Sequence, residues 1–324
     1  MTQVATVRGP VDSAALGRTY MHEHIFVLTP DVQQNYPEAW GDEEARVADA
    51  VQKLNELSAR GVTTIVDPTV VGLGRYIPRI QRIADQVPDL NIVVATGCYT
   101  YSDVPFFFHY RGPGLGQAAD PMVEMFVDDI TKGIAGTGVR AGMLKCAIDM
   151  QGMTGGVERI MRAVAKAHRL TGTPITIHTH PGTHQGLAAQ KVLDDEGVDP
   201  GRVVLGHSGD SSDVDHLQSL AEAGFILGMD RFGINVETTF ESRADTLVEL
   251  CQRGFAESMV LAHDAACYID WIEPWALGAM PQWHYLHILD DVLPYLLDRG
   301  VTEDQIETML TGTPRRIFET VDPY

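Results

Sequence analysis

Nearly continuous apolar runs recur along the chain and alternate with segments whose apolar residues have helical spacing. Two of these runs read NIVVA at 91–95 and RVVL at 202–205. Strands that are buried on both faces have this composition, which is typical of a parallel sheet. The pattern predicts eight strands, at residues 20–28, 62–70, 91–100, 142–149, 174–180, 202–207, 225–232 and 258–263.

The segments between the predicted strands are amphipathic. In segment 42–60, Val47, Val51 and Leu54 recur at helical spacing and predict one buried helix face. Several such segments end in glycine just before the next strand, as at Gly61 and Gly224, which is a common signal for a helix C-terminus. Further helices are expected at 156–170, 214–223, 244–253, 287–299 and 302–318.

Eight strand–helix units without a proline- or serine-rich linker predict an α/β fold, a (β/α)8 TIM barrel, in which residues 1–324 form a single domain. The alternative is an open doubly wound sheet. Such a sheet normally has a glycine-rich phosphate loop after its first strand. The first predicted strand carries His22-Glu23-His24 instead of that loop, so the barrel is the preferred fold.

Composition narrows the class of protein. The chain has 324 residues, a formal net charge of −20 and a pI near 4.8. Such a surface repels nucleic acid and anionic membranes. The sequence contains neither a signal-like apolar segment at its start nor a run of about 18 apolar residues. The four cysteines form no CxxC pair and are too few for a disulfide framework, which fits a reducing compartment. Together these features predict a cytoplasmic protein without nucleic-acid or membrane partners.

The candidate chemistry begins with His22 and His24 in the first predicted strand. Side chains in a strand alternate with a period of two, so both imidazoles are expected to project to the same face. Two neutral nitrogen ligands on one strand form half of a metal site. A lone histidine is more often a core or surface residue, but the paired spacing favours metal binding.

Other candidate ligands end separate predicted strands, and they are Lys145, His178, His207 and Asp264. The carboxyl ends of barrel strands meet at one rim, so all these side chains are expected to converge there. Lys145 lies in the run GMLKCAI, where a charged amine is costly unless it is paired or neutralised. His180 and His184 are rivals of His178, since His180 lies two residues further along and could share its face.

The ordered set of motifs resembles the phosphotriesterase family of the amidohydrolase superfamily, and within it the phosphotriesterase-like lactonases. The resemblance runs nearly end to end. It rests on MHEH at 21–24, Lys145, Ile177-His178, GHS at 206–208, GMDRFG at 228–233 and His263-Asp264.

This resemblance implies a centre of two divalent metal ions, zinc or else iron, cobalt or manganese. The more buried ion would be held by His22, His24 and Asp264. The more exposed ion would be held by His178 and His207. The family pattern favours His178 over its rival His180. A Lys145 carboxylated by CO2 would bridge the two ions together with a hydroxide. A neutral lysine amine can form such a carbamate, and the ions would lower the pKa of the bridging water.

The resemblance also implies the residues that act on the substrate. In the lactonase branch a tyrosine and an arginine line the pocket, and here Tyr99 ends the third predicted strand while Arg231 follows the seventh. Both are expected to be catalytic together with Asp264, which would take a proton from the hydroxide. An ion pair with Asp230 or another rim carboxylate is the plainer role for Arg231. Substrate contacts are expected from Tyr99, Arg231, Phe232, Tyr268 and Trp271.

The expected activity is the opening of lactone rings, above all those of N-acyl-homoserine lactones, which would quench quorum sensing. Promiscuous hydrolysis of organophosphate triesters is expected beside it, and a primary phosphotriesterase (aryldialkylphosphatase) is the nearest alternative. A lyase with a Schiff base on Lys145 and a non-catalytic metal-binding protein are alternatives from other classes. A homodimer is expected from the family, with aromatic residues of the predicted inserts 100–116 and 265–286 forming the contact or a substrate channel.

Overall fold

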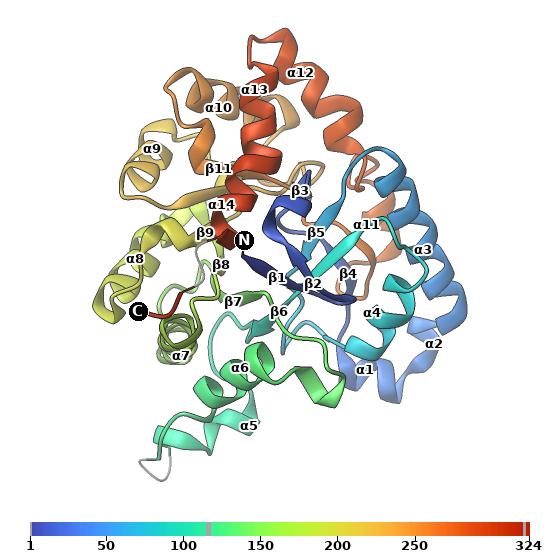
Figure 1. Ribbon diagram of the computed structural model, residues 1–324, viewed down its shortest axis with the longest axis vertical. Coiled ribbons are helices and arrows are strands. Elements are labelled where there is room, and N and C mark those ends of the chain that lie inside the picture. The colour runs from blue at the N-terminus through green and yellow to red at the C-terminus, as the bar shows by residue number, and fades with distance from the viewer. Residues whose placement is uncertain (1, 115–117, 320–321) are drawn as a thin grey trace.

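Eight parallel strands form the centre of the computed structural model, which describes residues 2–114, 118–319 and 322–324 (Figure 1). They are hydrogen-bonded in the order β11-β10-β9-β8-β7-β6-β5-β3. The Met21 N–H donates to the Leu261 carbonyl at 3.4 Å and joins the two ends of this order. The strands are β3 (Thr19–Tyr20), β5 (Thr64–Asp67), β6 (Asn91–Gly97), β7 (Met143–Ile148), β8 (Ile175–Thr179), β9 (Val203–Gly206), β10 (Ile226–Met229) and β11 (Met259–Leu261).

Helices surround this barrel and alternate with the strands, which confirms the predicted (β/α)8 TIM barrel (Figure 1). The main helices are α3 (Glu43–Ala59), α4 (Ile77–Ala84), α6 (Pro121–Thr131), α7 (Gly155–Thr171), α8 (Gln185–Glu196), α9 (Val214–Glu222), α10 (Phe240–Gln252) and α12 (Leu293–Asp298). Side chains cap several N-termini, as Asp42 does for α3 and Thr154 for α7. Such caps satisfy backbone N–H groups at a helix start and fix where the helix begins.

Shorter elements complete the chain. The short helices are α1 (Pro30–Asn35), α2 (Pro37–Trp40), α5 (Phe106–His109), α11 (Pro274–Gly278), α13 (Glu303–Glu307) and α14 (Thr313–Glu319). Turns of 3-10 helix lie at Ser13–Ala15, Gly112–Gly114, Ile134–Gly136, Pro181–Thr183, Pro200–Arg202, Ser208–Asp210 and Ala256–Ser258, and π-helical turns at Ile288–Val292 and Thr308–Gly312. The tail helix predicted at 302–318 is therefore interrupted by a π-helical turn. Residues 115 and 116 of the predicted insert 100–116 lie outside the described residues.

The amino-terminal end of the barrel is covered by the hairpin of β1 (Gln3–Thr6) and β2 (Gly9–Asp12), which crosses the strands in Figure 1. Just after β1, the Val7 N–H donates to the carbonyl of Ile92 near the start of β6. Val4 from the hairpin and Phe318 from α14 belong to the same buried cluster as Val93 inside the barrel. With this end covered, the opposite rim is the open end.

The prediction of one continuous strand at residues 20–28 is wrong, because the structure has two short strands there. β3 ends at Tyr20 and β4 (His24–Val27) begins four residues later, with irregular backbone between them. β4 pairs in parallel with β12 (Ala266–Ile269), a strand that the sequence pattern did not predict. The irregular stretch stays bonded to the barrel, since the Glu23 N–H donates to the Val66 carbonyl of β5 at 2.9 Å, while the buried Glu23 side chain bonds to the segment after β11. The other predicted strands exist but are shorter at one or both ends.

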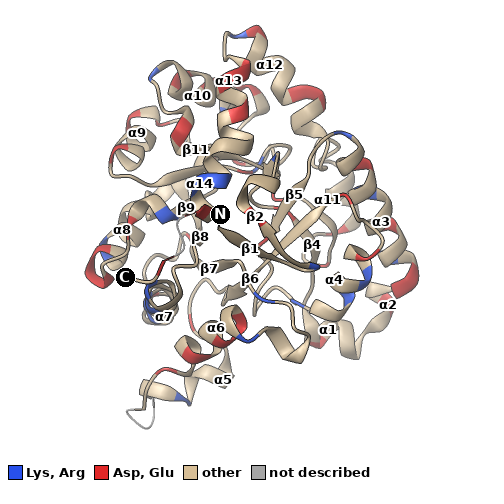
Figure 2. Ribbon diagram, in the orientation of Figure 1, with Lys and Arg blue, Asp and Glu red and all other residues tan. Residues whose placement is uncertain are grey.

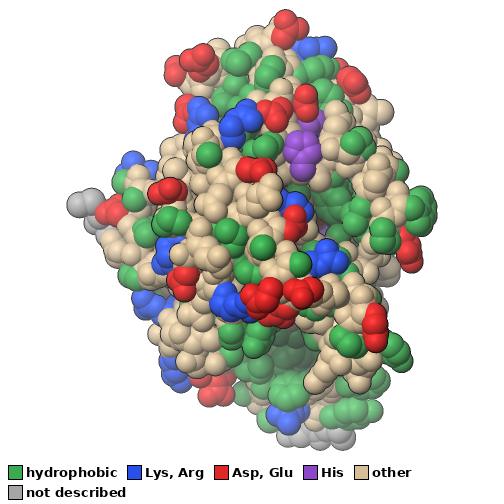
Figure 3. Space-filling view, turned by 90° about the vertical axis from the view of Figure 1, so that its right-hand side faces the viewer, with side chains coloured by type: hydrophobic (Ala, Val, Ile, Leu, Met, Phe, Trp, Pro, Cys, Tyr) green, Lys and Arg blue, Asp and Glu red, His purple; other side chains and the backbone are tan. Residues whose placement is uncertain are grey.

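The charges lie mainly on the outside. Figure 2 shows that acidic residues are spread over the outer helices, including α3, α8 and α12. On the face drawn in Figure 3, basic side chains are scattered among acidic and apolar ones rather than gathered in one patch. Across residues 2–114, 118–319 and 322–324, no helix is both long and apolar enough to cross a membrane.

Candidate metal centre

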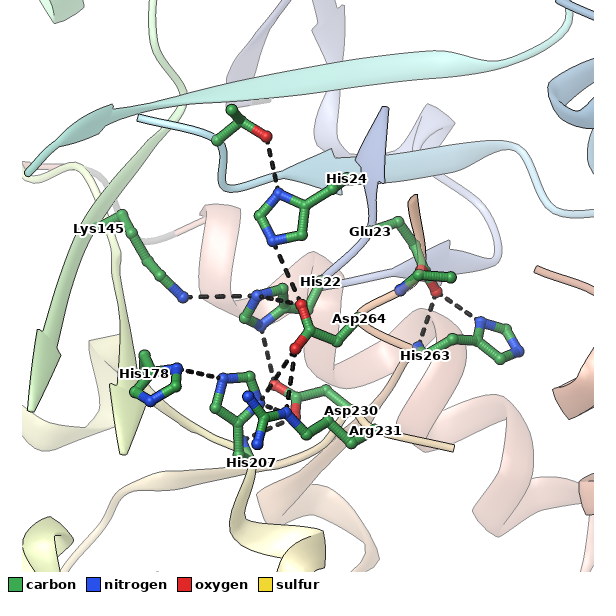
Figure 4. Close-up of polar contacts among 12 residues, drawn as sticks. His22, Glu23, His24, Lys145, His178, His207, Asp230, Arg231, His263 and Asp264 are labelled. Atoms are coloured by element: carbon green, nitrogen blue, oxygen red, sulfur yellow. Dashed lines mark hydrogen bonds and ion pairs between the residues drawn. The ribbon is translucent and has the colours of Figure 1, made fainter. Parts of the chain in front are cut away.

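The six predicted metal ligands meet at the open rim of the barrel and line one cavity of about 450 Å3 (Figure 4). Four of them follow or begin strands at the rim, while Lys145 and His178 lie within β7 and β8. Asp264 is the most exposed of the set, with 14% of its side chain accessible. The ligands are His22, His24, Lys145, His178, His207 and Asp264.

The inner atoms of these side chains form two groups. In the first, the Nε2 atoms of His22 and His24 each lie 3.3 Å from Asp264 Oδ1. In the second, His178 Nδ1 lies 2.8 Å from His207 Nε2. These are the residues that the family resemblance assigned to the two ions, and the assignment stays a prediction. His22 lies in irregular backbone and His24 begins β4, so the two rings do not share one face of a continuous strand as predicted. Their ring centroids are 5.4 Å apart.

A single buried carboxylate orients one histidine of each group. Asp230, just after β10, lies 3.0 Å from His22 Nδ1 through one oxygen and 3.0 Å from His207 Nδ1 through the other. It also accepts the backbone N–H of His207 at 2.7 Å. Because a carboxylate accepts hydrogen bonds, it keeps the proton of each neutral imidazole on Nδ1. Both Nε2 lone pairs therefore face inward.

The other two histidines have oxygen partners as well. His24 Nδ1 lies 2.7 Å from the Thr69 hydroxyl, which donates in turn to Asp67. His178 is reversed, since its Nε2 contacts Asp149 and its Nδ1 faces His207. All four imidazoles thus have an outer nitrogen with an oxygen partner and an inner nitrogen that points into the cavity.

This donor set fits two divalent cations. Nitrogen and carboxylate ligands suit Zn²⁺ and related ions, and a second set of oxygens around ligand histidines is typical of such sites. The inner nitrogens of His178 and His207 are only 2.8 Å apart, and two unprotonated nitrogens at that distance repel unless a cation or proton lies between them. The geometry therefore has a place for a cation beside the second group, and the first group offers a carboxylate oxygen with two imidazole nitrogens.

The electrostatics of the histidines differ. Burial lowers the pKa of His178 to about 4 and lowers the pKa values of His22 and His207, so these imidazoles are neutral near pH 7. Burial also acts on His24, but the carboxylates of Asp264 and Asp67 outweigh it and raise the pKa of His24 to about 9. In the metal-free protein His24 is a cation, and a metal ion must displace its proton.

Lys145 projects from β7 toward His22, with Nζ 3.5 Å from His22 Nε2 (Figure 4). Its side chain is 1% exposed. Burial lowers the pKa of this amine to about 8, against the opposing charges of Asp264 and Asp230. The neutral amine is therefore accessible in mildly alkaline solution.

Asp264 is the end of a chain of alternating charges. Arg231 donates from Nε to Asp264 at 3.0 Å and from a terminal nitrogen to Asp210 at 3.0 Å. The fully buried Arg243 of α10 donates to the other oxygen of Asp210 at 2.7 Å and to the Ile234 carbonyl at 2.7 Å. The ion pair expected for Arg231 therefore exists, but its partners are Asp264 and Asp210 rather than Asp230. These ion pairs hold the Asp264 oxygen that is turned away from His24.

Two predicted substrate residues besides Arg231 line the cavity. The Tyr99 hydroxyl lies 3.1 Å from His178 Nδ1 and 2.7 Å from the Tyr101 hydroxyl, and burial raises the pKa of Tyr99 well above its usual value. Trp271 stands at the mouth, with 45% of its surface exposed and its ring 6.0 Å from that of Tyr99. Apolar residues complete the walls, among them Leu73, Ile234, Ile269 and Met280.

The structure places two other predicted substrate residues outside this cavity. Phe232 is fully buried in the hydrophobic core, where its ring lies 5.9 Å from the Arg243 guanidinium of α10. Tyr268 lines a separate cavity with Trp40, donates its hydroxyl to the Ala39 carbonyl at 2.8 Å and stacks 3.8 Å from the Arg46 guanidinium. The predicted substrate contacts of Phe232 and Tyr268 are therefore wrong.

The rival histidines also lie elsewhere. The His180 ring bonds to the Thr183 hydroxyl at 3.0 Å within its own loop. His184 is exposed and stacks on His216 with ring centroids 4.0 Å apart. Sequence reasoning missed the oxygens that orient the ligands. Asp67, Asp149 and Asp230 lie within predicted strands, and only in the structure does each of them end or follow a strand as the ligands do.

A model of the phosphotriesterase family matches residues 2–318 of the chain. The chain belongs to the phosphotriesterase family. It is 57% identical over 326 residues to the phosphotriesterase homology protein of Mycobacterium tuberculosis, with both chains covered completely. It is 35% identical over 311 residues to the aryldialkylphosphatase of Saccharolobus solfataricus, covering 95% of this chain and 96% of the relative.

The solved structure of the phosphotriesterase from Mycobacterium tuberculosis matches the fold with a TM-score of 0.97 at 57% identity. The match covers 99% of this chain and 100% of that chain. The phosphotriesterase family expected from the motifs is thus confirmed, and the chain is a member of a family of metal-dependent hydrolases.

Metal loading should be strongly pH-dependent. Because the pKa of His24 is raised to about 9, the metal-free protein binds one proton more than the metal-bound site throughout the neutral range. The apparent Zn²⁺ association constant should therefore rise about tenfold per pH unit from His24 alone and level off above its pKa. Competition with a chromophoric chelator at several pH values measures this.

A matched variant separates this cause from a general pH effect. Asp67→Asn removes one carboxylate that raises the pKa of His24, so the plateau should begin at a lower pH. A pH-independent affinity, or the same curve for Asp67→Asn, would contradict the assignment.

Asp230→Asn should weaken metal binding at both groups. An amide cannot accept from both imidazoles, and loss of an orienting carboxylate typically costs about 10–100-fold in metal affinity. Asp129→Asn is the control, since Asp129 bonds to Arg75 and Thr96 on the neighbouring part of the barrel. Equal metal affinity in Asp230→Asn and the control would show that Asp230 does not orient the ligands.

Proposed function

We propose that the protein is a binuclear metal-dependent hydrolase that opens lactone rings, with N-acyl-homoserine lactones as the preferred class and organophosphate triesters as secondary substrates. The observation that supports it is the convergence of four inward-facing imidazole nitrogens, Asp264 and Lys145 in a cavity with apolar walls. When bound, two divalent ions supply polarisation of a carbonyl or phosphoryl oxygen and a lower pKa for water. Zinc, iron, cobalt and manganese all suit these ligands.

Lys145 would bridge the two cations after carboxylation. Its neutral amine attacks the carbon of CO2, an N–C bond forms as one C–O π bond breaks, and a proton leaves to solvent to give a carbamate whose single negative charge is shared by two oxygens. The lowered pKa makes the reactive neutral amine available. The carbamate also removes the buried positive charge that an apolar strand would otherwise contain.

Asp264 is suited to accept a proton during ring opening. Although burial favours its neutral form, the nearby histidines and Arg231 hold the pKa of this carboxyl well below its usual value, so it is ionised. Arg231 fixes its orientation by the Nε hydrogen bond. Tyr99 keeps its phenolic proton, because its pKa is raised, and can donate to an oxygen of the substrate beside His178.

The apolar walls suit an acyl chain. Ile269, Trp271, Ile272 and Met280 lie on the side of the cavity formed by the segment after β11. A flat ring ester would lie beside the ligands while its chain follows these side chains toward the mouth. Hydrolysis of acyl-homoserine lactones would make the protein a quorum-quenching enzyme.

A primary phosphotriesterase is the second candidate, favoured by the 35% identity to the relative named aryldialkylphosphatase.

The homodimer stays a prediction, and the exposed aromatic residues Phe106 and Trp275 of the two inserts are candidate contacts. Light scattering of the purified protein would determine the oligomeric state.

Comparison of two substrate classes tests the proposal. The metal-loaded protein should hydrolyse an acyl-homoserine lactone with a kcat/KM at least about tenfold above that for an aryl dialkyl phosphate triester, a difference of about 1.4 kcal/mol in transition-state stabilisation. A chelator should abolish both activities. A preference for the triester would favour the second candidate, and turnover that survives chelation but is trapped by borohydride would favour a Schiff base on Lys145.

Lys145→Met should abolish carbamate formation and lower lactone turnover at least about 10²-fold, since it removes a bridging ligand while keeping an apolar stem of similar length. After exchange with ¹³C-bicarbonate, NMR should detect one carbamate carbon per chain in the wild type and none in the variant. A variant with wild-type turnover would contradict the assigned role of this amine.

A further inference from the structure

The residue between His22 and His24 does not point into the cavity. Glu23 is fully buried, and its carboxylate accepts three hydrogen bonds from the segment after β11 (Figure 4). The donors are the His263 backbone N–H at 2.9 Å, the His263 ring Nδ1–H at 2.6 Å and the Ala265 backbone N–H at 3.1 Å. A buried carboxylate is costly, and this number of donors is the usual compensation.

These three donors flank Asp264 on both sides. Asp264 has a positive φ of 53°, a left-handed conformation that costs a non-glycine residue about 1 kcal/mol or more. Its own N–H donates to the His22 carbonyl at 3.1 Å, and the His24 N–H donates to the Ala265 carbonyl at 2.8 Å. Every position from 263 to 265 is therefore tied to the segment 22–24, through the Glu23 side chain at 263 and 265 and through backbone hydrogen bonds at 264 and 265.

The His263 ring extends this arrangement to the outer part of the barrel. Its Nε2 accepts the backbone N–H of Ile288 at 3.0 Å, which leaves the ring proton on Nδ1, where it donates to Glu23. The His263 carbonyl accepts from Trp283 Nε1 at 3.1 Å, and Trp283 lines the candidate cavity. Glu23 thus lies at the junction of the first and last strands of the barrel.

Only one of the two ligand groups depends on this junction. His22, His24 and Asp264 are each within one residue of Glu23 or of its hydrogen-bond donors. His178 and His207 project from β8 and from the end of β9, on the far side of the cavity, and are oriented by Asp149 and Asp230. Loss of the Glu23 hydrogen bonds would move the first group and leave the second in place.

We propose that Glu23 is a positioning residue that holds Asp264 in its left-handed conformation and so assembles the cation site of His22, His24 and Asp264, separately from the site of His178 and His207. The proposal rests on the two-cation centre of the proposed function. It concerns metal affinity at one site and does not depend on which ester the protein hydrolyses.

Glu23→Gln tests this by metal content. Wild type, Glu23→Gln and Asp149→Asn are loaded with Zn²⁺, dialysed against a graded series of chelator concentrations and analysed for zinc per chain. Glu23→Gln should lose one ion at a chelator concentration about 10–100-fold lower than wild type does, while the second ion is retained. Asp149→Asn, the matched control, should weaken the other ion.

His263→Gln covers the case in which Glu23→Gln does not fold. It retains both backbone donors to Glu23 and loses the acceptor for Ile288, so the same ion should be released a few-fold more readily while the other is unaffected. Two ions bound as tightly as in wild type by these variants, or both ions weakened equally, would overturn the proposal. A wild type that binds no zinc would instead reject the metal centre itself.

Discussion

Each neutral imidazole has one proton and one lone pair, and the arrangement of the site follows from where those protons lie. At four positions an oxygen atom lies beside the outer nitrogen, so the inner nitrogens converge on one cavity, and each offers a lone pair once His24 has lost its second proton. The oxygens belong to Asp67 through Thr69, to Asp149 and to Asp230. These residues end or follow three separate strands, β5, β7 and β10, so the barrel itself fixes the tautomers.

The junction between the first and last strands is the second constraint. A regular barrel ladder would leave the segment after β11 in extended conformation, whereas here β12 pairs with β4 and Asp264 adopts a positive φ. The strain is offset by hydrogen bonds from a segment that also contains His22 and His24. Strained backbone at a ligand is a feature that only a well-supported site can retain. His207, another ligand, has a positive φ of 65° and is likewise held by Asp230 through its backbone N–H.

The sequence was sufficient for the barrel and for the family, because buried parallel strands have a distinct composition and the ligand motifs are ordered along the chain. It was insufficient where the outcome depends on residues far apart in the chain. The sequence assigned no role to Glu23, whose partners lie about 240 residues away. Phe232 looked like a pocket residue, since nothing in the sequence distinguishes an apolar side chain beside a site from one beneath it. The strand formed by 266–269 was read as loop, because its pairing partner is fixed by tertiary contacts alone.

The convergence of lone pairs on two cations is tested most directly by anomalous diffraction from crystals loaded with Zn²⁺. We expect two peaks in the cavity, one bonded to the Nε2 atoms of His22 and His24 and to Asp264, the other to His178 Nδ1 and His207 Nε2, with density continuous from Lys145 between them. A single peak outside the cavity, or coordination through the outer nitrogens, would contradict the assignment.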